Sequence, residues 1–389
     1  MQCLEYGCNS EGCWVERMIP VCAPLLGKKE LEYTIDCIKT NWISSKGKYV
    51  EEFENKFAKY CDCKYGITTT SGTTALHLAI ASIGIKKDDE VIVPAFTMIS
   101  SVFPIVYCGA KPILVDADPE TWTMNINQVE EKITDRTKAI MPVHIYGHPC
   151  DMDPVLKLAE EYGLYVVEDA AEAHGAEYKG KRTGGIGDIG CFSFYANKII
   201  TCGEGGMIVT NDEEIAERAK SLKNLAFPKE KRIYLHSEVG YNYRMTNIQA
   251  AIGLAQLERI DELVEMRRRN ARIYNNLLEN VTGIRLPIEK EWAKNVYWMY
   301  SVLIEPDFPI CRDELARKLE NSGIETRPFF IPMHMQPVFQ NIGFFGGEKY
   351  PIAKELSRRG LHLPSSSGLK VDEIKYVCDS INKISGSQL

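Results

Sequence analysis

The sequence lacks a long hydrophobic run. No apolar stretch reaches the roughly 20 residues that a helix needs to cross a bilayer. The N-terminus also lacks the basic segment and apolar core of a secretory signal. Internal repeats and low-complexity tracts are absent as well. We therefore expect a cytoplasmic protein with no membrane partner.

An excess of positive charge is also missing. Lysine and arginine number 46 against 53 aspartates and glutamates, which gives a formal net charge of -7. Nucleic acids and anionic membranes attract basic surfaces, so we expect neither as the main partner. Hydrophobic residues at 45% and charged residues at 25% are ordinary for a globular protein.

The thirteen cysteines lack the spacing of a metal site. Cys3, Cys8 and Cys13 recur every five residues and Cys61 stands close to Cys63, but no CxxC element occurs. Zinc sites normally combine two such ligand pairs, so we expect no metal. The other cysteines are scattered among apolar positions like small core residues, which fits a reducing compartment.

The length of 389 residues predicts two domains. Between residues 70 and 210, helical stretches such as 152–162 alternate with short β-branched runs, which are found at 90–94, 111–115, 139–144 and 164–168. Such runs are typical of strands buried in a parallel sheet. The alternation predicts an α/β fold whose ligands bind at the C-terminal ends of the strands.

The C-terminal part of the sequence has a different pattern. Residues 247–277 predict one long amphipathic helix, and residues 298–304, 312–322 and 371–384 then predict a strand and two helices. We interpret this part as a smaller α+β domain. The predicted organisation is a leader at 1–18, a large α/β domain at 19–260 and a small α+β domain at 261–389.

One motif suggests dinucleotide binding but stands in the wrong context. Residues 185–190 match GxGxxG, a pattern that binds pyrophosphate where a strand leads into a helix. Here an alternating aromatic run that predicts a strand follows the glycines. The context therefore argues against a nicotinamide cofactor.

Lys198 carries the clearest chemical signal. It closes an aromatic run at 192–198 and is followed by a glycine-rich turn at 203–206, while Asp169 ends a predicted strand upstream. A nucleophilic lysine needs a lowered pKa and a fixed position, and a protonated pyridine nitrogen needs a buried acid. The pair suggests a Schiff-base lysine and the carboxylate that tunes its cofactor. The alternatives are a solvated lysine and a helix-capping aspartate.

The segment that begins at Ser71 predicts a capped helix N-terminus. Small polar residues at 71–74 lead into an apolar helical pattern. Free amides and the helix dipole favour an anion at such a position. Capping alone is the alternative explanation.

Six separated motifs together support a resemblance. In chain order they are SGT at 71–73, PAFT at 94–97, EDAAEAH at 168–174, FSFYANK at 192–198, GEGG at 203–206 and GYNYRM at 240–245. Over about residues 19–385 the chain resembles the DegT/DnrJ/EryC1/StrS family of sugar aminotransferases, which depend on pyridoxal 5'-phosphate (PLP). The resemblance implies the fold type I of PLP-dependent aminotransferases and PLP as the cofactor.

The resemblance also implies roles for individual residues. Lys198 would be the catalytic amine, Asp169 would pair with the pyridine nitrogen, and Glu172 would face the ring or its phenolic oxygen. The cofactor phosphate would be bound by Gly72, Thr73 and Ser193.

Two further positions bear on the cofactor. In the family an asparagine from the neighbouring subunit reaches the phosphate, and Asn242 matches it, which implies a homodimer with shared active sites. Many relatives stack an aromatic ring on the cofactor where this chain has Met98. Phe96, two residues earlier, is a possible substitute.

Substrate contacts are predicted only by similarity to family segments near the active site. Arg327 and His334 are candidates, with Arg327 able to pair with a diphosphate or the glutamate carboxylate. Residues 42–47 resemble the family loop that lines the sugar site.

The implied activity is transamination of a nucleotide-linked 4-keto-6-deoxy sugar with L-glutamate as amino donor. The residues most resemble members that convert GDP-4-keto-6-deoxymannose into GDP-perosamine. The alternatives are an aminotransferase that acts at C3 or C4 of a UDP- or dTDP-ketosugar, and a PLP-binding regulator without turnover. A sugar 3-dehydratase is disfavoured because known cases replace the lysine with histidine, whereas this chain keeps Lys198.

Overall fold

The computed structural model describes residues 18–228 and 234–386. Of the predicted leader only Met18 falls within this range, and Cys3, Cys8 and Cys13 lie outside it. Within these two ranges no helix is long and apolar enough to cross a bilayer.

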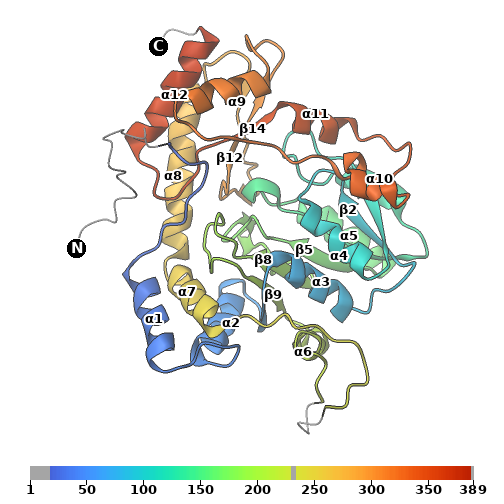
Figure 1. The fold of residues 1–389 in the computed structure, drawn as a ribbon. Helices are drawn as coiled ribbons and strands as arrows, with labels where there is room; N and C mark the ends of the chain where they lie inside the picture. Colours follow the sequence, from blue (N-terminus) through green and yellow to red (C-terminus); the bar gives the residue numbers. More distant parts are fainter. Residues whose placement is uncertain (1–17, 229–233, 387–389) are drawn as a thin grey trace.

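A seven-stranded sheet forms the centre of the structure, in the order β1-β9-β8-β5-β4-β2-β3 (Figure 1). Its strands are β1 (Tyr65–Thr69), β2 (Glu90–Pro94), β3 (Lys111–Val115), β4 (Thr137–Ile140), β5 (Tyr165–Asp169), β8 (Ile189–Ser193) and β9 (Gly206–Thr210). All neighbouring pairs are parallel except the two that β9 makes, with β1 and with β8. The predicted α/β fold with a mostly parallel sheet is confirmed.

Both faces of this sheet are buried, which explains why its strands are continuously apolar. Val91 and Val93 face one core, whereas Ile92 between them belongs to a second core with residues of α5. The helices of this part are α1 (Lys28–Lys39), α2 (Lys48–Tyr60), α3 (Gly72–Ser82), α4 (Phe103–Tyr107), α5 (Met152–Tyr162), α6 (Glu213–Leu222) and α7 (Asn247–Leu257).

A second sheet lies in the C-terminal part, in the order β10-β12-β14-β13, with every pair antiparallel. Its strands are β10 (Ile284–Arg285), β12 (Tyr300–Ile304), β13 (Arg327–Pro328) and β14 (Gly360–Leu363), and the helices of this part are α8 (Ile260–Leu278), α9 (Arg312–Asn321), α10 (Pro337–Asn341), α11 (Pro351–Arg359) and α12 (Val371–Ser385). A separate hydrophobic core fills the space between this sheet and helices α8, α9 and α12. A small third sheet joins β11 (Ala293–Lys294) to β6 (Glu177–Tyr178) and β7 (Lys181–Arg182).

The single long helix predicted at 247–277 is wrong. Two helices occupy this stretch, because α7 ends at Leu257 and α8 begins at Ile260. Arg259 lies between them with φ -122° and ψ 10°, and its amide donates to Gln256 in a tight turn. Neither glycine nor proline marks the break, so the apolar periodicity runs through it undisturbed. The predicted domain boundary near residue 260 stays a prediction.

The GxGxxG segment binds a carboxylate of the chain itself. It leads into the strand β8, which begins at Ile189. The amides of its residues Ile186 and Gly187, and of Gly184 just before it, donate to the buried Glu168 at 2.7–2.8 Å. His144 completes the shell at 2.9 Å. Its Nδ1 accepts from the Cys150 amide, so Nε2 carries the proton that it donates to Glu168. The glycine-rich segment therefore holds Glu168, the residue that precedes Asp169, through its backbone amides.

Replacing Glu168 with glutamine tests this arrangement. Glu168→Gln would point an amide NH2 group at backbone donors and leave them without acceptors. We expect the free energy of unfolding, measured by urea denaturation, to fall by about 3 kcal/mol.

Glu177→Gln provides the matched control. Glu177 forms a partly exposed ion pair with Lys294 at 2.8 Å, so its loss should change the free energy of unfolding by less than about 1 kcal/mol. Equal effects of the two substitutions would contradict a structural role for the Glu168 shell.

Candidate active site

A cavity of about 390 Å³ opens at the C-terminal ends of the central strands. Helix α3 follows β1, Asp169 ends β5 and Ser193 ends β8, so the sheet itself delivers these groups to one place. Seven of the residues predicted from the sequence line the cavity together: Gly72, Thr73, Met98, Asp169, Glu172, Ser193 and Lys198.

Lys198 is nearly enclosed within this cavity. Its side chain is 10% exposed, and its Nζ lies 3.7 Å from Glu172 Oε1 and 3.6 Å from the centre of the Trp298 ring. Burial lowers the pKa of the Lys198 amine, while Glu172 and Asp169 oppose that shift. The environment therefore makes the neutral, nucleophilic amine more accessible.

Glu172 is held between Lys198 and the backbone. Its Oε2 accepts from the amide of Tyr146 at 2.8 Å. Tyr146 has φ 55°, a left-handed conformation that is uncommon for a residue with a side chain. Burial raises the pKa of Glu172 to about 7, and Lys198 opposes this shift. Glu172 can therefore exchange a proton near neutral pH.

Asp169 lies at the base of the cavity. Its Oδ2 accepts from the Ser101 hydroxyl at 2.7 Å, and its Oδ1 accepts from the Ala171 amide at 3.1 Å. Ser101 in turn lies 2.7 Å from the Thr97 hydroxyl. Burial raises the pKa of Asp169, and the hydrogen bonds from Ser101 and Ala171 oppose that shift.

The start of α3 forms one wall, as the sequence predicts. Ser71 caps the helix by accepting from the Thr74 amide at 3.2 Å. The amides of Gly72 and Thr73 precede the first intrahelical bond, which runs from Ala75 to Ser71. A Cβ on Gly72 would lie 2.6 Å from the Cβ of Ser193, so only glycine allows the helix to come this close to β8.

Three predicted site residues lie outside this cavity within one chain. Asn242 is exposed before α7 and accepts from Arg244 at 2.7 Å. Arg327 is an exposed residue of β13 that pairs with Glu325. His334 lines a separate cavity of about 610 Å³. The roles predicted for these three residues stay predictions.

Two other expectations concern neighbouring segments. Phe96 cannot replace the missing stacking ring, because it is 1% exposed and packs on Phe329 and Tyr146, away from the cavity. Met98 lines the cavity and is 45% exposed. The loop at 42–47 contacts Asn247, whose side chain donates to the carbonyl of Trp42 at 2.7 Å.

Sequence reasoning missed two residues that shape the site. Ser101 stands in an unremarkable polar stretch, and the sequence predicts Trp298 only as the start of a strand. Both come from segments far from Lys198 in the chain. Only the fold brings them to the cavity, and no local pattern could have found them.

Comparison with known proteins gives a consistent result. The model of the DegT/DnrJ/EryC1/StrS aminotransferase family matches residues 24–382. A GDP-perosamine synthase of Escherichia coli O157:H7 is 47% identical over 94% of this chain and 98% of its own length. A GDP-perosamine synthase of Caulobacter vibrioides is 45% identical over the same shares.

A solved structure adds the cofactor. A Streptococcus pneumoniae protein, provisionally classed as a sugar aminotransferase and solved in its PLP form, superposes with a TM-score of 0.89. It is 26% identical, and the match covers 95% of this chain and 99% of that protein. PLP is the cofactor of the family.

The residues of the cavity fit PLP. The cavity combines a buried lysine of lowered pKa with an acid at its base and a helix N-terminus on one wall. These are the amine, the partner for a ring nitrogen and the anion site that the cofactor requires. The close approach of Gly72 to Ser193 shapes the wall where an anion would sit.

The buried Glu172 should make stability depend on pH. Its pKa is about 7 in the folded chain against an ordinary 4.5, so between these values the folded state binds more protons than the unfolded state. Stability of the cofactor-free chain should therefore fall as pH rises through this window, by about 3 kcal/mol. Glu172→Gln should remove most of this fall, as measured by urea denaturation at several pH values.

Glu314→Gln is the control for this experiment. Glu314 is on the surface of α9, 3.8 Å from Lys318, and its replacement should leave the pH dependence unchanged. A Glu172→Gln variant with the same pH dependence as the original chain would contradict the assignment.

Proposed function

The chain belongs to the DegT/DnrJ/EryC1/StrS aminotransferase family, and we propose that it transfers an amino group from L-glutamate to GDP-4-keto-6-deoxymannose, yielding GDP-perosamine. The observation that carries the proposal is the buried Lys198 beside Glu172, in one cavity with Asp169. The choice of sugar is supported by the 45–47% identity to two GDP-perosamine synthases along nearly their whole length.

PLP supplies an electron-poor ring that stabilises negative charge at the carbon next to the amine being transferred. Asp169 would hold a proton on the ring nitrogen, and the Ser101 hydroxyl, which donates to Asp169, orients its carboxylate. The amides of Gly72 and Thr73 and the Ser193 hydroxyl would hold the phosphate. Met98, which lines the cavity, would take the place of an aromatic side chain beside the ring.

Lys198 has two tasks in this proposal. Its amine would hold the cofactor, and the same amine, when free, would move a proton to and from the substrate carbon. Glu172, whose Oε1 lies 3.7 Å from the amine, would be the partner for the phenolic oxygen. Arg327 and His334 are proposed to contact the substrates.

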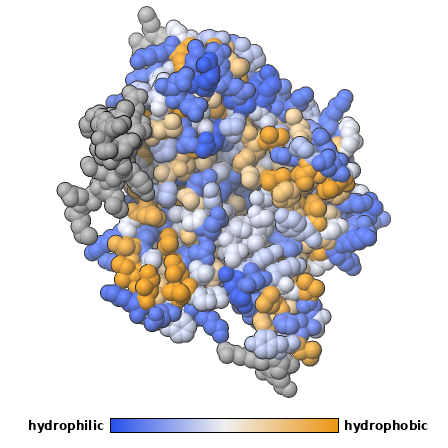
Figure 2. All heavy atoms as spheres, in the orientation of Figure 1, coloured by the Kyte–Doolittle hydropathy of each residue, from blue (hydrophilic) through white to orange (hydrophobic). Residues whose placement is uncertain are grey.

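We also propose that the active site is completed in a homodimer. Asn242 is exposed and outside the cavity of its own chain, so its side chain is available to a neighbouring copy. An apolar stripe gathers over α1 in Figure 2. It consists of the exposed Leu31, Ile35 and Ile38 of α1, which follow helical spacing and would be buried in such an interface.

Incubation with the ketosugar and glutamate tests the substrate. We expect GDP-perosamine and 2-oxoglutarate in equal amounts, detected by mass spectrometry, and at least a 1,000-fold loss of turnover in Lys198→Ala because the nucleophilic amine is gone.

The same assay with dTDP- and UDP-linked ketosugars separates the alternatives. Robust amination of one of these sugars without amination of the GDP sugar would contradict the substrate assignment. A cofactor absorbance that never changes on addition of glutamate would instead favour a PLP-binding regulator.

Mixing two inactive variants tests the shared site. Lys198→Ala and Asn242→Ala each damage both sites of their own homodimer. If Asn242 serves the partner's cofactor, a mixed dimer has one site that carries both changes and one site that carries neither. Unfolding and refolding an equal mixture should therefore restore about a quarter of the original activity, since about half of the dimers are mixed.

The parallel control refolds each variant alone. Activity that stays at the level of the separate variants would contradict a cross-subunit role for Asn242. A protein that sediments as a monomer would contradict the homodimer.

A further inference from the structure

Trp298 places its indole face against the amine of Lys198. The Nζ atom lies 3.6 Å from the ring centre, and Trp298 is 5% exposed. An ammonium this close to a buried indole is attracted by the negative face of the ring. Phe192 and Phe194, which precede Lys198 in the chain, do not supply this contact, because they pack edge-on against Phe57.

Hydrogen bonds fix both the side chain and the backbone of Trp298. Its Nε1 donates to the carbonyl of Asn197, the residue before Lys198, at 2.8 Å. Its own carbonyl accepts from the buried Arg267 of α8. A Cβ on Gly147 would lie 2.9 Å from the amide of Trp298, so the backbone there is closely packed as well.

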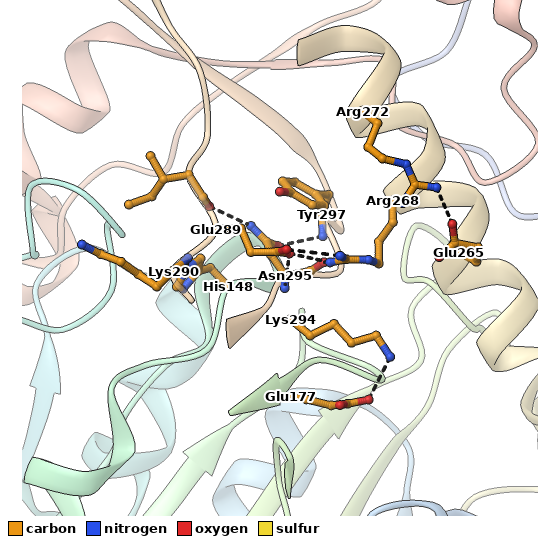
Figure 3. A network of polar contacts seen from close by, with 11 residues as sticks. His148, Glu177, Glu265, Arg268, Arg272, Glu289, Lys290, Lys294, Asn295 and Tyr297 are labelled. Atoms are coloured by element: carbon orange, nitrogen blue, oxygen red, sulfur yellow. Dashed lines mark hydrogen bonds and ion pairs between the residues drawn. The ribbon is translucent and has the colours of Figure 1, made fainter. Parts of the chain in front are cut away.

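A polar network holds the segment that leads into Trp298 (Figure 3). Asn295 accepts from the amide of Tyr297 at 2.8 Å, and its own amide donates to Glu289 at 2.8 Å. Arg268 of α8 pairs with Glu289 and donates to the carbonyl of Asn295. Tyr297 adopts φ 47°, a turn that such contacts must stabilise because it is unfavourable for a tyrosine.

We propose that Trp298 is a positioning residue, whose indole face holds the ammonium of Lys198 while that amine is not bound to the cofactor. The proposal rests on the proposed role of Lys198 as the cofactor-binding amine. Glu172 and Trp298 then hold the released amine from two sides, 3.7 Å and 3.6 Å away. The ammonium that forms when this amine takes a proton is thereby held in place until it delivers that proton.

Other groups act on the same amine and are unchanged by replacing Trp298. Glu172, Asp169 at the end of β5, and Cys22 near the N-terminus favour the charged amine. Burial opposes it most strongly. The buried His174 is also close enough for its pKa to be lowered by Lys198. These groups act on Lys198 in every variant, so any effect of Trp298 must appear as a difference in the pKa of Lys198 between variants.

The test compares Trp298→Phe with Trp298→Leu. Both variants lose the indole N–H and its bond to Asn197, but only phenylalanine keeps an aromatic face. The full-length protein is loaded with pyridoxamine phosphate, which leaves Lys198 free, and acetylation of Lys198 by acetic anhydride is followed against pH by mass spectrometry. The exposed Lys87 is the internal standard.

We expect the titration midpoint of Lys198 in Trp298→Leu to lie about one pH unit below that in Trp298→Phe. Superimposed titrations of the two variants would overturn the proposal, because a purely structural tryptophan would affect both alike. If the leucine variant does not fold, Trp298→Met gives the same comparison. The measurement needs no turnover, so its outcome is independent of whether the sugar assignment holds.

Discussion

The placement of one buried lysine against two buried carboxylates is the constraint on which the site depends. A charged group in a low-dielectric interior is costly unless its partners are close. Opposite charges lie close to one another here, on Lys198 and on the carboxylates of Glu172 and Asp169. They do not form a tight ion pair, since Lys198 Nζ lies 3.7 Å from Glu172 Oε1. The result is a set of groups whose protonation can change during a reaction, which a short salt bridge would prevent.

Much of the surrounding structure serves to fix these charges. Glu168 immediately precedes Asp169 in the chain. Its carboxylate accepts hydrogen bonds from the amides of the glycine-rich loop and from the His144 ring. The amide of His144 donates in turn to the carbonyl of Asp169 at 3.1 Å. A segment that resembles a dinucleotide motif is therefore a clamp on the end of β5. Its glycines allow backbone amides to approach a carboxylate, the same physical property that elsewhere serves pyrophosphate.

The sequence predicted the parts of this structure that depend on local patterns. The strands β2 and β3 and the helix α5 have the predicted bounds, because apolar periodicity and flanking turns mark them. Lys198, Asp169 and the helix N-terminus after Ser71 were predicted from local patterns, and the other cofactor-side residues were predicted from the family resemblance. Ser101 and Trp298 could not be predicted, since their roles arise from contacts with residues 68 and 100 positions away. The break at Arg259 was missed because no residue of low helix propensity marks it.

The predicted residues that the cavity brings together are on the cofactor side of the site, and those predicted to contact the substrate or a neighbouring copy lie outside it. The seven cavity residues that local motifs identified surround one region, and one chain supplies them all. Asn242, Arg327 and His334 lie elsewhere on that chain, on exposed or separately hollowed surfaces. If a second copy completes the site, recognition of the sugar nucleotide depends on how two surfaces meet, whereas binding of the cofactor is set by the fold of one chain. Substitutions on those surfaces could then change the substrate while the buried charges around Lys198 stay intact, which would let one family act on different sugars with the same chemistry.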